Sequence, residues 1–280
     1  MRVILVYSWL SVVGLFIVFK GIPPLILLLK VFCAMTGTGI GMYFWNDICD
    51  YKQDISSSAK EFAPSSRPIG MGLVSKRRME IFSVLMVALG LTSAALINIE
   101  VLLIQSAFLF IFFIYSAEPI RLKRIFLMKQ VIVTIGGAMA GLTAGLAAGS
   151  ITVQLIYLIG LYMLFTMGVN PILDIKDIES DIVGGVKTIP IVLGPGFTLR
   201  LALATFTASA LSTWVGFYGF GFNIALPILG TIVLAAFMYV MYPLLGHLED
   251  HEYMTKIIIT RGYPLYFVLQ IAVLVGSLSF

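Results

Sequence analysis

The feature that most constrains this chain is a series of nine apolar runs, each close to the length needed to cross a lipid bilayer. A helix that spans the hydrocarbon core needs about 17–25 residues of low polarity. Because backbone groups in lipid must satisfy their own hydrogen bonds, such runs predict helices. We therefore expect an all-α, multi-pass membrane bundle of about nine transmembrane helices. The expected spans are approximately residues 3–19, 24–46, 79–98, 101–116, 130–149, 152–173, 197–217, 223–245 and 263–280.

Composition supports lipid as the solvent for most of the chain. The sequence is 60% hydrophobic and only 11% charged, with a mean hydropathy of +1.03, whereas soluble domains carry about 25% charged residues. The first run is expected to remain as a helix, since no small-residue cleavage site of a signal peptide follows it. The net charge of +4 is interpreted as a topology signal, so no nucleic-acid partner is predicted.

Basic residues gather on alternate connections between the spans. By the positive-inside rule these connections face the cytoplasm, which predicts a cytoplasmic N-terminus, an outer C-terminus and a site on the cytoplasmic side of the cell membrane. The short connections between them are nearly uncharged. The basic residues in question are Lys52, Lys60, Arg67, Lys76, Arg77, Arg78, Arg121, Lys123, Arg124, Lys129, Lys176, Lys187, Lys256 and Arg261.

Two segments on this predicted cytoplasmic side share one acidic pattern, D-x2-D-x3-D. The first is NDICDYKQD at 46–54, and the second is DIKDIESD at 174–181. The chain has seven aspartates, and six of them lie in these two segments. Because four spans separate the motifs, they have the same orientation. This predicts a parallel internal repeat within a single membrane domain of residues 1–280.

The acidic spacing has a chemical meaning. Positions i, i+3 and i+7 share one face of an α-helix, so each motif forms an acidic stripe if the second and sixth spans continue into it. Such stripes near a membrane need a cation, and carboxylates with phosphate oxygens suit Mg²⁺. A solvated helix edge is the alternative interpretation. The candidate catalytic residues and metal ligands are Asp47, Asp50, Asp54, Asp174, Asp177 and Asp181.

Further candidates lie in the polar segments near the motifs. SSRPIG supplies Arg67, YSAEPIRLKR supplies Tyr115, Arg121 and Lys123, and GGVKTIP supplies Lys187. Arginine and lysine bind phosphate oxygens well, so these residues are candidates for substrate binding. Basic residues at cytoplasmic helix ends are also expected from topology alone, and that interpretation stays open here.

Two other patterns favour structural roles. The run GGAMAGLTAGLAAG at 136–149 is rich in small residues, which predicts close packing between helices. A smooth wall beside an isoprenoid chain is its alternative interpretation. His247 and His251 have the i, i+4 spacing of zinc ligands, but no nearby residue is a compelling third ligand. We interpret their segment, HLEDHE, as a solvated loop.

Taken together, NDICDYKQD, the RP at 67–68, YSAEPIRLK and DIKDIESD followed by GGVKTIP resemble the UbiA superfamily of intramembrane prenyltransferases. The resemblance covers approximately residues 40–195. It implies a helical bundle with a central cavity open to lipid, a polyprenyl diphosphate donor, membrane lipid as surroundings and two Mg²⁺ ions. It places one ion on the first acidic motif, with Asn46 beside the donor, and the other ion on the second motif. It also implies that Arg67, Arg121 and Lys123 contact the diphosphate.

The reaction implied by this resemblance is Mg²⁺-dependent transfer of a prenyl group, through an allylic carbocation, to a hydrophobic acceptor. The acceptor is an aromatic quinone precursor or a lipid such as geranylgeranylglyceryl phosphate, and the sequence does not choose between them. A secondary transporter is the alternative from another class, since transporters also carry acidic residues and internal repeats. A non-catalytic scaffold of the same family is a third interpretation. The CDP-alcohol phosphotransferases also use paired aspartates, but their gathered signature is missing here.

Overall fold

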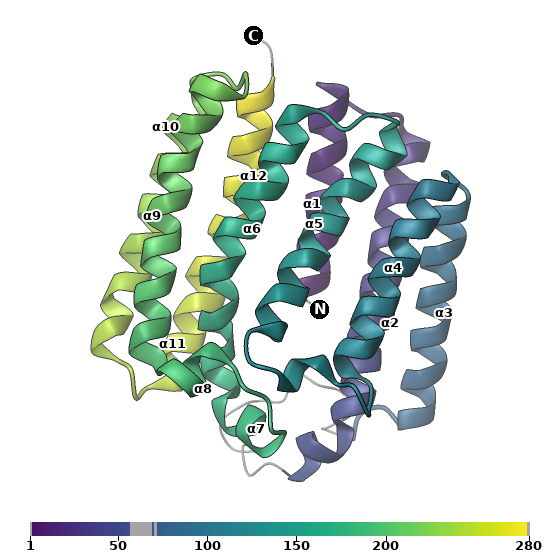
Figure 1. Cartoon of the computed structure of the whole chain (residues 1–280), viewed down its shortest axis with the longest axis vertical. Helices are drawn as coiled ribbons and strands as arrows, with labels where there is room; N and C mark the ends of the chain where they lie inside the picture. The colour runs from purple at the N-terminus through teal and green to yellow at the C-terminus, as the bar shows by residue number, and fades with distance from the viewer. Residues whose placement is uncertain (1, 57–68, 70–71, 279–280) are drawn as a thin grey trace.

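The computed structural model describes residues 2–56, 69 and 72–278, and this part of the chain folds into helices joined by short connections. The long helices lie side by side and run along one common direction (Figure 1). α5 packs against α1 and α6, α2 against α3, and α9 against α6 and α10. The long helices are α1 (Arg2–Phe19), α2 (Leu25–Ser56), α3 (Lys76–Ala95), α4 (Ile99–Ser116), α5 (Met128–Ala148), α6 (Val153–Asp174), α9 (Pro195–Gly219), α10 (Ala225–Met241) and α12 (Tyr263–Ser277).

Short helices gather at one end of the bundle, where α7, α8 and α11 lie together with the polar end of α2 (Figure 1). The C-terminus lies at the opposite end. These short elements connect long helices and build the polar end described below. They are the 3₁₀-helices η2 (Leu122–Arg124), η3 (Ile175–Asp177) and η4 (Tyr242–Gly246), the α-helices α7 (Ile178–Val183), α8 (Ile189–Leu193) and α11 (His251–Ile257), and the π-helix η5 (Ile258–Gly262).

The predicted spans match the long helices in number and order. Within the described residues, eight helices are long and apolar enough to cross a membrane, and Val6–Phe19 of α1 is a shorter apolar helix. Helix starts are set by side-chain caps: Ser75, Asn98 and Thr152 each accept a hydrogen bond from a backbone N–H of the first turn, which satisfies a group that the helix leaves unpaired. The largest difference is α2, which continues past the predicted end at residue 46 to Ser56.

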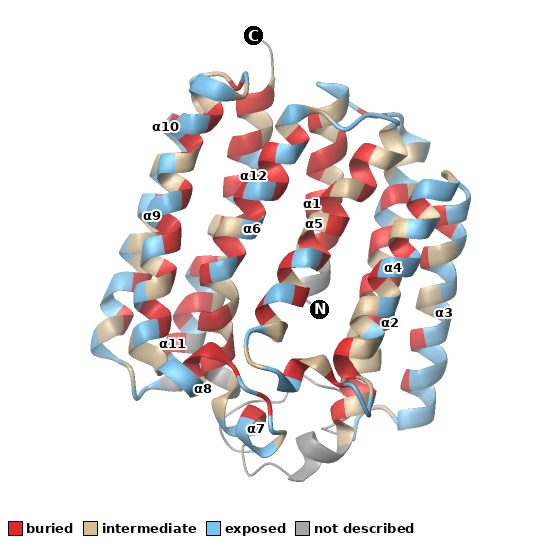
Figure 2. Cartoon of the chain, viewed as in Figure 1, coloured by how far each residue is buried: buried red, intermediate tan, exposed pale blue. Residues whose placement is uncertain are grey.

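Buried and exposed residues both occur along the long helices (Figure 2), and large apolar side chains are found in both groups. Inside, Phe165 stacks on Phe206 at a centroid distance of 5.2 Å, and Phe237 packs against both rings. Outside, large apolar side chains such as Leu85 and Leu103 are exposed. Helices that are hydrophobic all round belong in lipid or in a large core, so these outer faces are lipid-facing.

The glycine-rich segment lies in α5 and allows α6 to approach closely, as predicted. A Cβ atom added at Gly137 would lie 1.7 Å from Cε1 of Tyr162, and one added at Gly141 would lie 2.5 Å from Cγ1 of Ile159. Carbon atoms in van der Waals contact are about 3.5–4.0 Å apart. The close spacing of α5 and α6 therefore requires glycine, which has no side chain, at these two positions.

Replacing Gly137 with alanine is expected to destabilise the bundle by about 1–3 kcal/mol, because the added methyl group forces α5 and Tyr162 apart. Gly160 on α6 is the matched control, since an added Cβ there meets nothing within 4 Å. Alanine at Gly160 is expected to be neutral or slightly stabilising, as alanine is a better helix former. Thermal unfolding in detergent measures both variants. Equal melting temperatures for them would contradict the close contact.

Candidate active site

The first acidic motif lies inside α2, which stays helical through it. Asp47 and Asp50 are therefore about one turn apart on a single helix, as their spacing predicts. Asp47 is 0% exposed and Asp50 is 4% exposed. The third member, Asp54, belongs to the same helix, but its side chain lies outside the described residues. Charged groups buried to this extent need partners of opposite charge.

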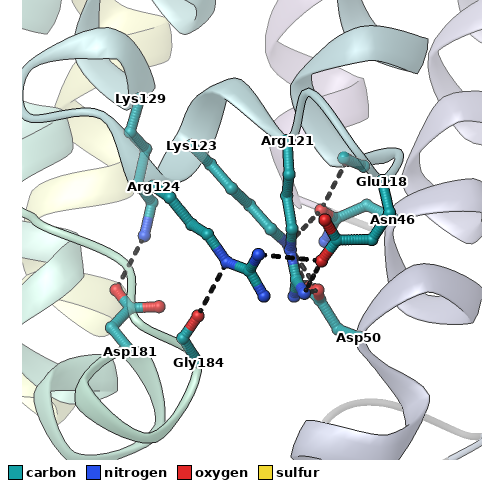
Figure 3. A network of polar contacts seen from close by, with 10 residues as sticks. Asn46, Asp50, Glu118, Arg121, Lys123, Arg124, Lys129, Asp181 and Gly184 are labelled. Atoms are coloured by element: carbon teal, nitrogen blue, oxygen red, sulfur yellow. Dashed lines mark hydrogen bonds and ion pairs between the residues drawn. The ribbon is translucent and has the colours of Figure 1, made fainter.

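Two basic side chains from the connection between α4 and α5 bind Asp50 (Figure 3). Arg121 donates from Nη2 to Oδ1 of Asp50 at 2.8 Å. Lys123 donates to both carboxylate oxygens, with 2.6 Å from Nζ to Oδ2. Both basic residues are buried as well. The structure thus brings Asp50 together with two other predicted site residues that lie 71 and 73 positions further along the chain.

The backbone of this connection aims both basic side chains inward. Arg121 has φ 40° and ψ 62°, in the left-handed region, and η2 follows it directly. This conformation costs a non-glycine residue free energy, and such strain concentrates at functional sites. Oε1 of Glu118 pairs with Nη1 of Arg121 at 3.0 Å and with Nη1 of Arg124 at 2.9 Å. Arg124 also donates from Nε to the carbonyl of Gly184 at 3.3 Å, which ties the connection to the segment after α7.

Asn46 and Tyr115 complete the first half of the site. Oδ1 of Asn46 accepts from Ser116 at 2.9 Å and from Nζ of Lys123 at 3.1 Å. Tyr115 is buried, and Nζ of Lys123 lies 5.9 Å from the centroid of its ring. An ammonium at that distance is attracted by the ring face. Lys123 is therefore positioned by a carboxylate, an amide and an aromatic ring.

The second acidic motif does not continue α6 as a regular helix. α6 ends at Asp174, where the N–H of Ile175 bonds to the carbonyl of Ile172, and η3 and α7 follow. The prediction of one α-helical stripe is therefore wrong for this motif, because a 3₁₀ turn rotates successive side chains by more than an α-helix does. Asp174 and Asp181 are buried, at 5% and 9% exposure, and Asp177 is half-buried.

Two residues that the sequence did not mark as candidates hold this second motif together. Nζ of Lys129 lies 2.9 Å from Oδ1 of Asp174 and 3.0 Å from Oδ2 of Asp181. Nε2 of Gln130 donates to Oδ2 of Asp174 at 2.8 Å. Both come from the first turn of α5. The only sequence signal was that Lys129 is basic and lies at a predicted cytoplasmic helix end, which topology explains equally well.

The remaining candidates are less closely placed. Lys187 is exposed between α7 and α8, and its predicted contact with substrate remains a prediction. Arg67 lies outside the described residues. His247 packs its ring on Tyr253 at 4.8 Å between centroids. Among the side chains that the structure describes, no group of three or more His, Cys, Asp or Glu is arranged to hold a metal ion, and the side chain of His251 lies outside the described residues.

An apolar cavity of about 50 Å³ lies inside the bundle beneath the second motif. Its walls come from α1, α5, α6, α10, η5 and α12, and they include Ile172 and Leu173, which directly precede Asp174. Tyr162, Tyr263 and Tyr266 are the tyrosines among its lining residues. A cavity of this size holds a few water molecules and not a long prenyl chain. Occupation by a longer apolar molecule therefore requires the lining side chains to move.

The carboxylates suit Mg²⁺, although they are bound by protein groups in this structure. The oxygens of Asp174 and Asp181 that contact Lys129 lie at most about 6 Å apart, since both touch the same nitrogen. The two carboxylates thus already share one cation, the Lys129 ammonium. Mg²⁺ in proteins typically takes one or two carboxylates and completes its shell with water and phosphate oxygens, so a buried pair of this kind is a sufficient donor set.

Comparison with known proteins identifies the family. The model of the UbiA prenyltransferase family matches residues 7–253. The chain is 30% identical over 236 residues to a digeranylgeranylglyceryl phosphate synthase of Thermococcus kodakarensis, and the match covers 81% of this chain and 80% of that protein.

Solved structures share the fold. A UbiA homologue from Aeropyrum pernix K1 superimposes with a TM-score of 0.69 at 20% identity, covering 99% of this chain and 98% of that one. A UbiA homologue from Archaeoglobus fulgidus, solved with GPP and Mg²⁺, superimposes with a TM-score of 0.64 at 18% identity and covers 98% of each chain. The family match, over most of the chain, favours a prenyltransferase over the transporter alternative. The chain belongs to the UbiA prenyltransferase family and is an integral membrane enzyme.

Proposed function

We propose that this protein transfers a prenyl group from a polyprenyl diphosphate to a hydrophobic acceptor, in a reaction that depends on Mg²⁺. One observation carries the proposal: four separate segments of the chain bring carboxylates and basic groups together at one end of the bundle, beside an apolar cavity. A prenyl diphosphate has the same division into a highly charged head and an apolar tail. The parallel orientation of α2 and α6 further supports a repeat of two similar halves in one domain.

The diphosphate head is assigned to the space between the two acidic motifs. Arg121 and Lys123 are placed there by Asp50, and both can offer N–H groups to phosphate oxygens. Charge-assisted hydrogen bonds of this kind are the strong ones, and in a dry site they are stronger than in water. These side chains are directed at the place where negative charge grows as the leaving group departs.

The acidic residues are proposed to bind this head through divalent cations. Asp47, Asp50 and Asp54 would act on the α2 side, and Asp174, Asp177 and Asp181 on the α6 side. When bound, Mg²⁺ supplies positive charge that stabilises the departing diphosphate. Asn46 would hold its amide beside the donor, where Ser116 and Lys123 now orient it.

The chemical step transfers negative charge to the departing diphosphate. The bond between the allylic C1 and the oxygen that links it to phosphorus breaks, and its electron pair stays with the diphosphate. The acceptor's nucleophilic atom forms a new bond to C1 and releases a proton, which the departing diphosphate can take up. The cavity keeps water away from the allylic cation, which would otherwise be quenched.

For the acceptor, we propose a lipid that carries a glyceryl phosphate group and a free hydroxyl. The supporting observation is the 30% identity to a relative named as a digeranylgeranylglyceryl phosphate synthase. In that case the new bond is an ether bond, formed by the acceptor hydroxyl. An aromatic acceptor would instead form a carbon–carbon bond at the ring.

The test incubates membranes containing the protein with labelled geranylgeranyl diphosphate, Mg²⁺ and a panel of acceptors, and identifies products by mass. The panel contains geranylgeranylglyceryl phosphate and several aromatic quinone precursors. We expect transfer to the glyceryl phosphate lipid, loss of transfer with EDTA and recovery with added Mg²⁺. Transfer to an aromatic ring alone would correct the acceptor. Activity unaffected by chelation would contradict the metal assignment.

The polar end of the bundle is proposed to face the cytoplasm, as the distribution of basic residues indicates. In a variant without Cys33 and Cys49, we introduce one cysteine at Glu249 or at Ser150. Both positions are exposed, Glu249 in the connection between η4 and α11 and Ser150 in the connection between α5 and α6. These two connections lie at opposite ends of the bundle (Figure 1). A membrane-impermeant maleimide is expected to label the Glu249 position only in inside-out vesicles and the Ser150 position only in right-side-out vesicles. The reverse pattern would place the site outside.

A further inference from the structure

Resting on the proposed function, we propose that Tyr266 sets the maximum length of the prenyl tail that the donor can carry. The ring of Tyr266 packs against the rings of Tyr162 and Phe165, and we call these three residues the aromatic barrier. The donor tail extends from the acidic motifs into the bundle and ends at this barrier. Donors whose tails exceed the space between the motifs and the barrier are then bound poorly.

The aromatic barrier lies between two cavities. The first is the cavity of about 50 Å³ beneath the second acidic motif, and the second has a volume of about 10 Å³. The three barrier residues line both cavities, and all three are buried. The ring centroid of Tyr266 lies 6.2 Å from that of Tyr162 and 5.8 Å from that of Phe165. Aromatic rings at such distances are packed together, so the barrier separates the two cavities.

The second cavity lies deeper in the bundle, further from the second acidic motif. α6 ends at the polar end of the bundle, whereas α12 runs away from that end (Figure 1). On α6, the first cavity reaches Leu173, next to Asp174, and the second cavity is lined by Leu158. On α12, Tyr263 lines the first cavity and Val273 lines the second. Two helices of opposite direction therefore give the same order of motif, first cavity, barrier and second cavity.

The depth of the barrier limits the tail. Phe165 and Tyr162 precede Asp174 by 9 and 12 residues. Because an α-helix rises about 1.5 Å per residue, the barrier lies roughly 14–18 Å from Asp174 along α6. An extended tail whose diphosphate is bound at the motifs occupies this depth first. Each further isoprene unit would need the space that the barrier rings fill.

The barrier rings on α6 are held by other helices. Phe165 stacks on Phe206 of α9, and Tyr162 lies against α5, where a Cβ atom at Gly137 would be 1.7 Å from its ring. Side chains packed at this density do not move aside without displacing their neighbours. Tyr266 closes the barrier from α12. Its removal therefore opens the barrier and leaves the packing of α6 against α5 and α9 in place.

The test compares how tightly the protein binds donor analogues of different length. Purified protein in detergent with Mg²⁺ is titrated with farnesyl, geranylgeranyl and geranylfarnesyl thiolodiphosphates, which do not react, and dissociation constants are measured by calorimetry. We expect the wild type to bind the geranylgeranyl analogue about tenfold more tightly than the geranylfarnesyl analogue, the lower end of what an apolar pocket achieves for a small difference in size. In Tyr266→Ala this preference is expected to disappear or reverse, because the two cavities join.

Val169→Phe tests the barrier from the opposite side. Val169 lines the first cavity one helical turn from Phe165, on the side of the second motif, so a larger side chain there shortens the available space. We expect the preference to move to the farnesyl analogue. Tyr157→Ala is the matched control, because Tyr157 is a buried tyrosine of α6 that packs on Phe222 and is not among the residues that line either cavity. This control is expected to keep the wild-type preference.

Each outcome decides the inference. Equal affinity of the wild type for the geranylgeranyl and geranylfarnesyl analogues would overturn it, since the tail would then not end at the barrier. An unchanged preference in a folded Tyr266→Ala would also overturn it. If that variant failed to fold, an unchanged preference in Val169→Phe would have the same consequence. Failure of every analogue to bind the wild type would instead contradict the proposed function, and this inference with it.

Discussion

Asp174→Asn is expected to lower the rate of prenyl transfer by roughly a thousandfold, an effect at the upper end of those seen when one charge-stabilising group is removed. The substitution keeps the size and shape of the side chain but removes its negative charge. Lys129 then retains Asp181 as its described partner and is no longer fixed between two carboxylates. The part of the proposed diphosphate site that the second motif forms then loses one carboxylate for the divalent cation and the fixed position of Lys129.

The matched control for this prediction is Asp250→Asn. Asp250 is the one aspartate of the sequence outside the two acidic motifs. It is exposed, and its Oδ1 accepts a hydrogen bond from the backbone N–H of Tyr253, which an asparagine oxygen can also do. Initial rates with labelled donor, normalised to the amount of protein in the membrane, are expected to be unchanged for this control. Turnover close to wild type in Asp174→Asn would remove the second motif from the mechanism.

The second large effect is expected for Lys123→Met, with a loss of about a hundredfold to a thousandfold in kcat. Methionine preserves the length of the side chain but offers no N–H group to the leaving diphosphate. Asp50 keeps Arg121 as a partner at 2.8 Å, so the local fold is expected to survive. Because Lys123 is assigned to the diphosphate of the donor, the KM for the acceptor is expected to change little.

Lys76→Met is the matched control for this effect. Lys76 begins α3 on the same predicted side of the membrane, but its side chain is 54% exposed and it pairs with Glu80 at 3.8 Å. Exposed pairs of this kind contribute little to stability, and wild-type kinetics are expected. If Lys123→Met loses affinity for the acceptor but keeps kcat, its assignment to the diphosphate is incorrect.

Most of the fold could be predicted because a backbone that crosses lipid must satisfy its own hydrogen bonds, which favours helices of a limited range of lengths. A run such as 152–173 must be helical to cross a bilayer, and the cap at Thr152 sets its start within one residue of the prediction. The acidic motifs could also be recognised in the sequence, because six of its seven aspartates lie in two segments with the same spacing, which is unusual in an apolar chain. Spacing along a helix also placed Asp47 and Asp50 correctly on one face of α2.

The sequence could not predict what the acidic residues contact. Lys129 and Asp174 are 45 positions apart, and their pairing depends on how α5 begins relative to the end of α6, which no local pattern encodes. Lys129 also looks like any other basic residue at a cytoplasmic helix end. The end of α6 at Asp174 was also not predictable. The D-x2-D-x3-D spacing is the one expected of a continuous α-helix, and nothing in it indicates the 3₁₀ turn of η3.

The contacts around Glu118 imply that added salt weakens the exposed ion pairs of this network before it weakens the buried ones. Glu118 is 56% exposed and Arg124 is 45% exposed, whereas the side chains of Lys123 and Asp50 are each 5% exposed. Dissolved ions weaken pairs that reach water and have little effect on pairs that do not. Moderate salt would therefore release the outer pair of Glu118 and Arg124 first, loosening the connection between α4 and α5 while the inner pair stays closed.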